Sequence, residues 1–160
     1  MPSIFMEKFL QNLQEAEKMI RTADHLIYVT FPLIKDKKLL LKIILETKAA
    51  IANCINSILQ YEYLYKRINL YKDPMLNFRT FKDKCAQRYK MTGEEIKLIL
   101  ELFEIVEKHK KSTMEFIRRE KVIILSENLE QKTISVDKIK EFILLAKSIL
   151  NKTKDKFNPV

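Results

Sequence analysis

Two residues near the start of the chain have the types and the spacing that RNA cleavage would need. Arg21 and His25 lie four positions apart, so a helix would place both side chains on one face. A neutral histidine can transfer protons while a neighbouring arginine holds a phosphate group. The alternative is a structural hydrogen-bonded cluster, because Asp24 can reach either Arg21 or Tyr28 on the same helix. We favour the structural interpretation, and Arg21 and His25 remain the catalytic candidates.

Residues 61–90, which we call the basic aromatic corner, combine aromatic rings with positive charge. They hold seven of the chain's 15 aromatic residues and carry a net charge of +5, whereas the other 130 residues carry only +4. Basic side chains bind phosphates, and aromatic rings stack on unpaired bases. The pattern therefore predicts RNA or another nucleic acid as a ligand.

A packed bend between helices is the alternative interpretation of the basic aromatic corner, with the lysines solvating its outer face. In that case the inward side chains are those of Tyr61, Tyr65, Phe78 and Phe81. Tyr63, Arg67 and Tyr71 are the residues that core packing explains least. The nucleic-acid-binding candidates are Tyr63, Arg67, Tyr71, Lys72, Arg79, Lys82 and Arg88.

Composition and spacing exclude several kinds of catalytic site. Gly93 is the single glycine, whereas glycine-rich nucleotide-binding loops need several. Neither His25 nor His109 follows a glutamate by three positions, which is the spacing of di-iron helical bundles. Cys54 and Cys85 form no Cys-x-x-Cys pair. We therefore expect no metal and no cofactor.

The overall charge and hydropathy indicate a soluble protein with a basic surface. The chain has 160 residues, of which 47% are hydrophobic and 32% charged, and a net charge of +9. Such a charge favours anionic partners, although a lysine-rich proteome would produce the same balance without one. The longest uncharged run, Ala49 to Tyr61, is 13 residues long, and a membrane span needs about 20. We expect a cytoplasmic protein with no signal peptide and no membrane contact.

The helical elements that would position these residues follow from the scarcity of glycine and the spacing of apolar residues. One glycine cannot supply the turns of a β-rich fold, so we expect an all-α fold: an antiparallel bundle of four long helices and one short helix. We expect a single domain over residues 1–160.

Caps and prolines predict the helix boundaries. The first helix runs from Ser3 to the region of Tyr28–Phe31, because Pro32 disfavours continuation. The second follows Asp36, with an apolar stripe through Ile68. A short helix is predicted from about Phe78 to Tyr89, and a long one from the capping box Thr92–Glu95 through Ile124. A last helix follows Ser135 and Asp137 and frays from about Lys152.

Helix length points to self-association. The second and fourth helices would each be about 50 Å long, which is long for one chain of this mass. The stripe of the fourth helix also turns polar after Val106, near Lys110. We therefore predict a homodimer through a helix face, with a separate protein partner as a further option.

The order of the helices, together with the Arg21–His25 pair, resembles the HEPN superfamily of prokaryotic helical domains. Residues 23–36 also look like a segment of archaeal helical proteins. The HEPN resemblance implies a dimeric bundle and, in its ribonucleases, an arginine followed by a histidine after four to six residues, late in the chain. Here three residues separate Arg21 from His25, and both lie early.

These patterns leave three functional hypotheses. The leading one is a noncatalytic, dimeric, HEPN-like interaction module. The alternatives are an RNA-binding or other nucleic-acid-binding protein that uses the basic aromatic corner, and a metal-independent HEPN-type ribonuclease that uses Arg21 and His25.

Overall fold

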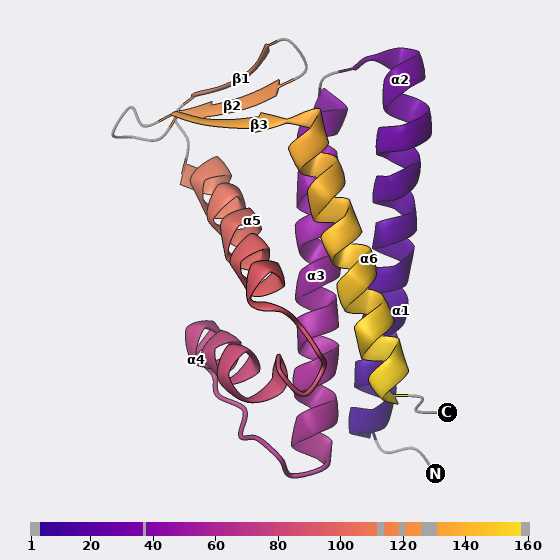
Figure 1. Cartoon of the computed structure of the whole chain (residues 1–160), viewed down its shortest axis with the longest axis vertical. Helices are drawn as coiled ribbons and strands as arrows, with labels where there is room; N and C mark the ends of the chain where they lie inside the picture. Colours follow the sequence, from indigo (N-terminus) through magenta and orange to yellow (C-terminus); the bar gives the residue numbers. More distant parts are fainter. Residues whose placement is uncertain (1–3, 37, 112–113, 119–120, 126–130, 158–160) are drawn as a thin grey trace.

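The computed structural model describes residues 4–36, 38–111, 114–118, 121–125 and 131–157. Helices make up most of these residues, which confirms the expected all-α class. The long helices α1 (Ile4–His25), α3 (Lys38–Leu64) and α6 (Val136–Phe157) lie side by side, and α5 (Gly93–Lys111) packs against α3 and α6 (Figure 1). None of the helices in these ranges is long and apolar enough to cross a membrane.

The first helical segment passes through Pro32 instead of ending before it. A π-helical turn, η1 (Leu26–Thr30), joins α1 to the short helix α2 (Phe31–Ile34). A proline inside a regular helix clashes with the carbonyl four residues earlier, and the wider π-helical turn relieves that clash. The expected end at Tyr28–Phe31 is therefore wrong, and the segment continues to Ile34.

Helix α3 forms the centre of the core. Its predicted apolar stripe is buried from Leu40 to Ile58 against α1 and α6. The buried hydroxyl of Ser57 donates to the carbonyl oxygen of Phe9 in α1 at 2.7 Å, which satisfies a polar group inside the core. The helix ends at Leu64, earlier than the expected end near Ile68.

Helix α4 (Pro74–Thr80) begins earlier than the expected start at Phe78. The Asp73 carboxylate accepts a hydrogen bond from the amide of Met75 at 2.9 Å, and a proline occupies the first helical position. Both are common features of helix starts. A second π-helical turn, η2 (Phe81–Cys85), continues α4.

The start of α5 agrees with the sequence pattern, and its end does not. The Thr92 hydroxyl accepts from the amide of Glu95 at 3.1 Å, and the Glu95 carboxylate accepts from the amide of Thr92 at 3.0 Å, so the capping box is confirmed. The helix ends at Lys111, and the expected continuation to Ile124 is wrong. The polar break near Lys110 marks this helix end.

A small antiparallel sheet replaces the second half of the expected fourth helix. Its three strands, in the order β1-β2-β3, are β1 (Met114–Arg118), β2 (Lys121–Leu125) and β3 (Gln131–Ser135). The register pairs Phe116 with Ile123 and Ile123 with Thr133. Aromatic and β-branched residues are enriched here, and such residues favour strands over helices.

Both helices that motivated a dimer are shorter than expected. Helix α3 has 27 residues and α5 has 19, which correspond to about 40 Å and about 28 Å. The lengths of these two helices and the polar break near Lys110 therefore do not support self-association. Evidence for a dimer has to come from exposed side chains.

Helix α6 begins where the sequence predicts and extends farther. The Ser135 hydroxyl accepts a hydrogen bond from the amide of Lys138 at 3.1 Å, as an N-cap residue does. The segment expected to fray from Lys152 is helical to Phe157, whose ring contacts that of Phe9 with centroids 5.0 Å apart. The end of α6 is therefore packed against the start of α1.

Two cysteines are part of the core. Cys54 in α3 and Cys85 at the end of η2 are both free and buried. Burial raises the pKa of each thiol to about 12. Both thiols are therefore almost wholly protonated at neutral pH.

Candidate nucleic-acid interface

The basic aromatic corner and the end of α6 lie at the same end of the molecule. The corner comprises the end of α3, α4, η2 and the loop to α5, and the last turns of α6 lie beside the end of α3 (Figure 1). The ring of Phe157 stacks on that of Tyr61 with centroids 4.3 Å apart. We call the corner together with Lys152, Lys154 and Lys156 the basic end.

A buried carboxylate holds two of the candidate arginines. The side chain of Glu62, in the last turn of α3, has no exposed surface. Its carboxylate accepts from Arg67 at 2.7 Å and from Arg88 at 2.5 Å, each through one guanidinium nitrogen. The two arginine side chains are 40% and 39% exposed, so their other donors are open to solvent. Glu62 thus fixes two guanidinium groups at the surface.

Three lysines end helical segments or turns in the left-handed conformation that usually favours glycine. They are Lys35, Lys66 and Lys90, with φ of 52°, 59° and 59°. Such a conformation costs about 1–2 kcal/mol in a residue with a Cβ atom. The turn at Lys66 brings the amide of Arg67 to 3.0 Å from the carbonyl oxygen of Glu62 and so positions the arginine for its ion pair.

The remaining basic candidates do not join the arginine pair. Lys72 lies in the loop after α3, Arg79 in α4 and Lys82 in η2, and all three side chains are exposed. Lys82 lines a separate depression with Lys97 at the start of α5. The structure therefore brings Arg67 and Arg88 together and leaves the other three along the outer surface.

The aromatic candidates Tyr63 and Tyr71 are 41% and 47% exposed. Phe81 is fully buried, as the packed-bend interpretation predicts, but Tyr65 is 49% exposed, so its predicted inward position is wrong. Helix α3 has ended one residue before Tyr65, and the ring lies 5.2 Å from the guanidinium carbon of Arg67. Exposed tyrosines next to arginines are typical of surfaces that stack unpaired bases.

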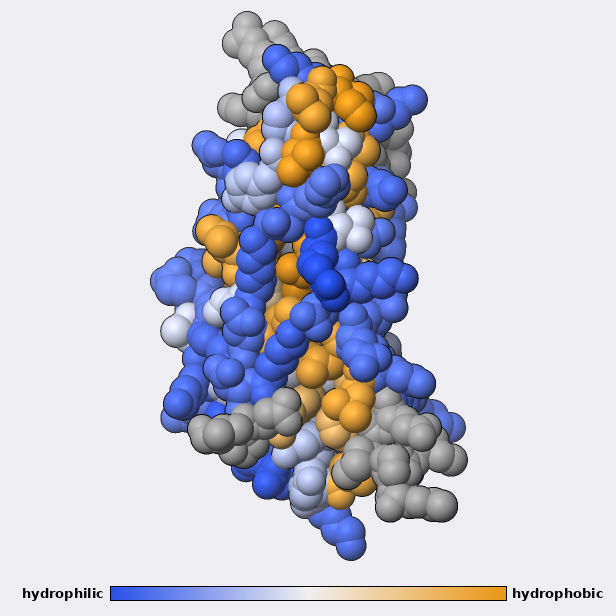
Figure 2. Space-filling view, turned by 90° about the vertical axis from the view of Figure 1, so that its right-hand side faces the viewer, coloured by the Kyte–Doolittle hydropathy of each residue, from blue (hydrophilic) through white to orange (hydrophobic). Residues whose placement is uncertain are grey.

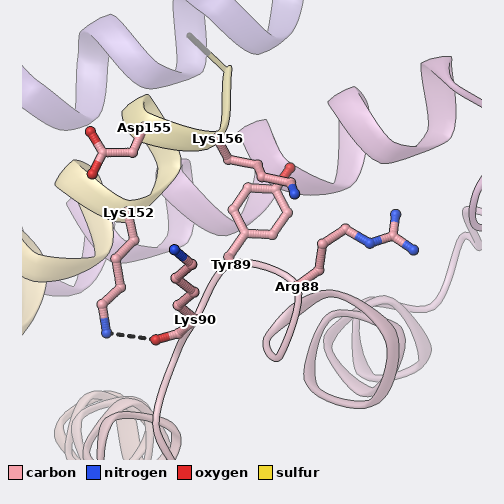
Figure 3. Close-up of a pocket in the computed structure, with 6 residues that line it drawn as sticks. All are labelled: Arg88, Tyr89, Lys90, Lys152, Asp155 and Lys156. Carbon is pink, nitrogen blue, oxygen red and sulfur yellow. Dashed lines mark hydrogen bonds between the residues drawn. The ribbon is translucent and has the colours of Figure 1, made fainter. Parts of the chain in front are cut away.

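A cavity of about 260 Å³ lies between the corner and α6, and sequence reasoning did not find it. Its lining is mostly basic, and Figure 3 shows Lys156 of α6 next to the ring of Tyr89, whereas the guanidinium group of Arg88 extends away from that ring. The lining residues are Arg88, Tyr89, Lys90, Lys152, Asp155 and Lys156.

Contacts across the cavity attach α6 to the start of α5. The Lys152 ammonium donates to the carbonyl oxygen of Lys90 at 2.8 Å and to the Glu95 carboxylate. Ser148 also donates to Glu95, at 2.7 Å. Although burial raises the pKa of Glu95, the hydrogen bonds from Lys152, Ser148 and the Thr92 amide outweigh it and hold the pKa below its ordinary value. Glu95 is therefore charged at neutral pH and keeps Lys152 in place.

No protein family, no curated protein and no solved structure matches this chain. The resemblance to the HEPN superfamily therefore stays a prediction. Within the ranges that the structure describes, no three His, Cys, Asp or Glu side chains are grouped so as to hold a metal ion. Support for a function comes from the side chains at the basic end and at the surface.

Tyr89 is the most unusual residue of the cavity. It is 2% exposed, and its ring meets that of Phe157 edge-on with centroids 6.3 Å apart. Its hydroxyl makes no hydrogen bond to the described residues. Burial raises the pKa of the phenol, so the hydroxyl stays protonated and is a donor without an acceptor.

The catalytic candidates lie far along α1 from the basic end. Arg21 and His25 are both exposed, and His25 is the last residue of α1. Asp24 pairs with Lys147 of α6 at 2.5 Å, and the ring of Tyr28 lies 5.9 Å from the same ammonium group. The polar residues of this segment thus include an ion pair that connects two helices.

One sequence signal could have revealed the contribution of α6. The apolar spacing of that helix continues from Leu150 through Thr153 to Phe157, with lysines at 152, 154 and 156 between. Thr153 is fully buried, so the helical period extends into the tail. Because the residues between these positions are charged, the sequence alone predicts that the tail frays.

Proposed function

We propose that the protein is a noncatalytic helical module that binds single-stranded nucleic acid, with RNA as the principal ligand, through its basic end. The observation that carries the proposal is the cavity in which α6 adds Lys152 and Lys156 to Arg88 and Lys90 of the corner. Positive side chains from distant parts of the chain converge on one site, as binding of a phosphate backbone requires.

The exposed tyrosines favour a single strand over a duplex. Tyr63, Tyr65 and Tyr71 lie within or beside the segment that follows α3 and present between 41% and 49% of their surface. Stacking on a ring needs an unpaired base, because the base faces of a duplex are already stacked. Any base has such a face, so binding of this kind is tolerant of sequence.

Lys66 and Lys90, whose backbone is in the left-handed conformation, allow a direct test of the proposal. Glycine adopts φ near +60° without strain, so Lys66→Gly and Lys90→Gly remove a charge and leave the turn intact. With an unphosphorylated oligoribonucleotide, we expect the double variant to lower the slope of log affinity against log salt by about 1.4 and the affinity by about 25-fold at 0.1 M salt. A fluorescence anisotropy titration at several salt concentrations measures both quantities.

Lys35→Gly is the matched control, because Lys35 has the same backbone conformation but lies after α2, at the other end of the molecule. We expect its binding to equal that of the wild type. Tyr71→Ala should weaken binding without changing the salt slope, because stacking releases few ions. Absence of binding at tens of micromolar protein in low salt, or an equal loss in Lys35→Gly, would contradict the proposal.

Self-association is a second candidate function, and a different surface favours it. Leu33 and Ile34 in α2 are 80% and 64% exposed, and Tyr28 and Val29 in η1 are nearly half exposed. Figure 2 shows an apolar area at the end of the molecule where α2 lies, whereas most of that face is hydrophilic. Adjacent exposed apolar side chains of this kind mark interaction sites, and a second copy offers the same patch in return.

The expected result for this second candidate is a dimer mass in light scattering that falls to the single-chain mass in the Leu33→Glu/Ile34→Gln variant. Both side chains are exposed, so the substitutions should leave the core unchanged. A single-chain mass for the wild-type protein across micromolar concentrations would rule the dimer out.

A further inference from the structure

The depression between η2 and the start of α5 is an apolar groove that shares no lining residue with the cavity at the basic end. Its volume is about 460 Å³. We infer that this groove binds an amphipathic helix of a partner protein, in which acidic residues flank the apolar face. The inference goes beyond strand binding, because it assigns a second kind of partner to a second surface. The lining residues are Lys82, Ala86, Gln87, Met91, Gly93, Ile96, Lys97 and Leu100.

Gly93, the single glycine of the chain, has no role in the fold that alanine could not fill. Its φ is not positive, so the backbone conformation does not require glycine. A Cβ atom at this position would meet no atom of the described residues within 4 Å, so packing does not require glycine either. Glycine is costly in conformational entropy and is useful where another molecule approaches the backbone closely. Gly93 therefore points to a partner whose main chain lies against the start of α5.

The apolar lining has a buried floor and an accessible wall. Met91 and Ala86 are 8% and 5% exposed, whereas Leu100 is 44% exposed. Gly93, Ile96 and Leu100 are three and four positions apart along α5, so they share one face of that helix. The described lining contains no aromatic ring, so the groove offers no surface on which an unpaired base could stack. An apolar side chain of a protein fits it better than a nucleotide.

Two other modes of peptide recognition do not fit the groove. Addition of a strand requires a free sheet edge, and the sheet β1-β2-β3 lies at the opposite end of α5 (Figure 1). Recognition of proline-rich segments uses grooves lined by aromatic side chains. An amphipathic helix instead inserts apolar side chains spaced three and four residues apart into an apolar groove. The lining therefore favours a helix as the partner segment.

Both charged residues of the lining are lysines, one from each wall. Lys82 of η2 and Lys97 of α5 are exposed, and neither has a carboxylate partner among the described residues. Acidic residues beside the apolar face of a partner helix would complement them. A second copy of this chain would not, because a two-fold contact through the groove brings the same lysines together. The charge therefore favours an acidic partner of another kind.

The test uses three synthetic helical peptides of about 18 residues that carry leucines at the same spacing of three and four positions. The residues beside the leucines are glutamate in the first peptide, glutamine in the second and lysine in the third. We expect the glutamate peptide to bind about tenfold more tightly than the lysine peptide at about 0.1 M salt. Fluorescence anisotropy of the labelled peptides measures the affinities.

Two variants of the groove make the test specific. Lys82→Glu/Lys97→Glu should reverse the preference, so that the lysine peptide becomes the tighter ligand. Gly93→Gln should weaken binding of the glutamate peptide about tenfold, because the new side chain occupies space that the helix needs. The free protein has room for this side chain, and circular dichroism checks that the variant is folded.

Lys18→Glu/Lys42→Glu is the matched control for net charge. Both lysines are exposed, lie in α1 and α3, and do not line the groove. This variant should retain the preference for the glutamate peptide. Loss of the preference in this variant would attribute it to the charge of the whole molecule and overturn the inference.

The remaining outcomes separate this inference from strand binding. Equal affinities for the three peptides, no binding at submillimolar protein, or an unchanged affinity in Gly93→Gln would each overturn it. Displacement of the glutamate peptide by the unphosphorylated oligoribonucleotide would place the strand in the groove and also overturn it. None of these results would contradict strand binding at the basic end, which the lysine-to-glycine variants test separately.

Discussion

Replacing Arg67 and Arg88 together by methionine is expected to lower the free energy of unfolding by about 3–5 kcal/mol. The Glu62 carboxylate has no exposed surface, and the two guanidinium groups are the partners that compensate its charge. Without them, a buried carboxylate is left unpaired, which is far more costly than losing an exposed ion pair. Urea denaturation followed by circular dichroism measures the change.

The control adds Glu62→Leu to the same two substitutions. If the loss comes from an unpaired buried charge, the triple variant should recover most of the stability, because an apolar side chain of similar volume can replace a buried ion pair. A triple variant as unstable as the double would instead attribute the loss to packing of the arginine stems. This non-additivity also shows why binding tests that truncate these arginines would confuse folding with affinity.

Phe157→Ala is expected to destabilise the protein by about 3 kcal/mol. The ring of Phe157 contacts those of Phe9, Tyr61 and Tyr89, with centroids between 4.3 and 6.3 Å apart. Its removal opens a space among three aromatic residues and releases the last turn of α6 from α1 and α3. Thermal or urea denaturation measures the loss.

Leu144→Ala is the matched control on the same helix, because Leu144 is 58% exposed. We expect a change of at most about 0.5 kcal/mol for that variant. A loss for Phe157→Ala as small as that for Leu144→Ala would instead indicate that the tail frays, as the sequence alone predicts.

Much of the helical scaffold could be predicted because its signals are local. The apolar stripe of α3 and the reciprocal hydrogen bonds of Thr92 and Glu95 depend on residues within a few turns of one another. The wrong boundaries also have local causes. Pro32 predicts a helix end, because the π-helical turn that lets the helix continue is not visible in a periodicity, and the same is true of η2 after Thr80.

The strands after Lys111 were missed for a different reason. The apolar residues Ile117 and Ile124 lie at positions that fit a helical period, and the same residues also belong to short runs of β-branched and aromatic side chains. Short apolar runs fit either structure, so periodicity alone does not decide between them. Pairing with neighbouring strands decides it, and pairing is not a property of one segment.

The candidate site could be predicted only in part. The basic aromatic corner is contiguous in sequence, so composition alone reveals it. The burial of Glu62 and the approach of Lys152 and Lys156 depend on how α6 packs against the corner, more than 60 residues away in sequence. In the sequence, Glu62 is merely one acid in a basic stretch. In the structure it determines where two of the arginines lie.

The buried thiols make the protein convenient for site-specific chemical labelling. The chain has only Cys54 and Cys85, and both are buried with a raised pKa, so neither reacts readily with maleimides while the protein is folded. A cysteine introduced at an exposed position such as Leu33 or Tyr71 would then carry the dye alone. Fluorophores could thus be attached to either end of the molecule, to distinguish strand binding from self-association, without first removing a native residue.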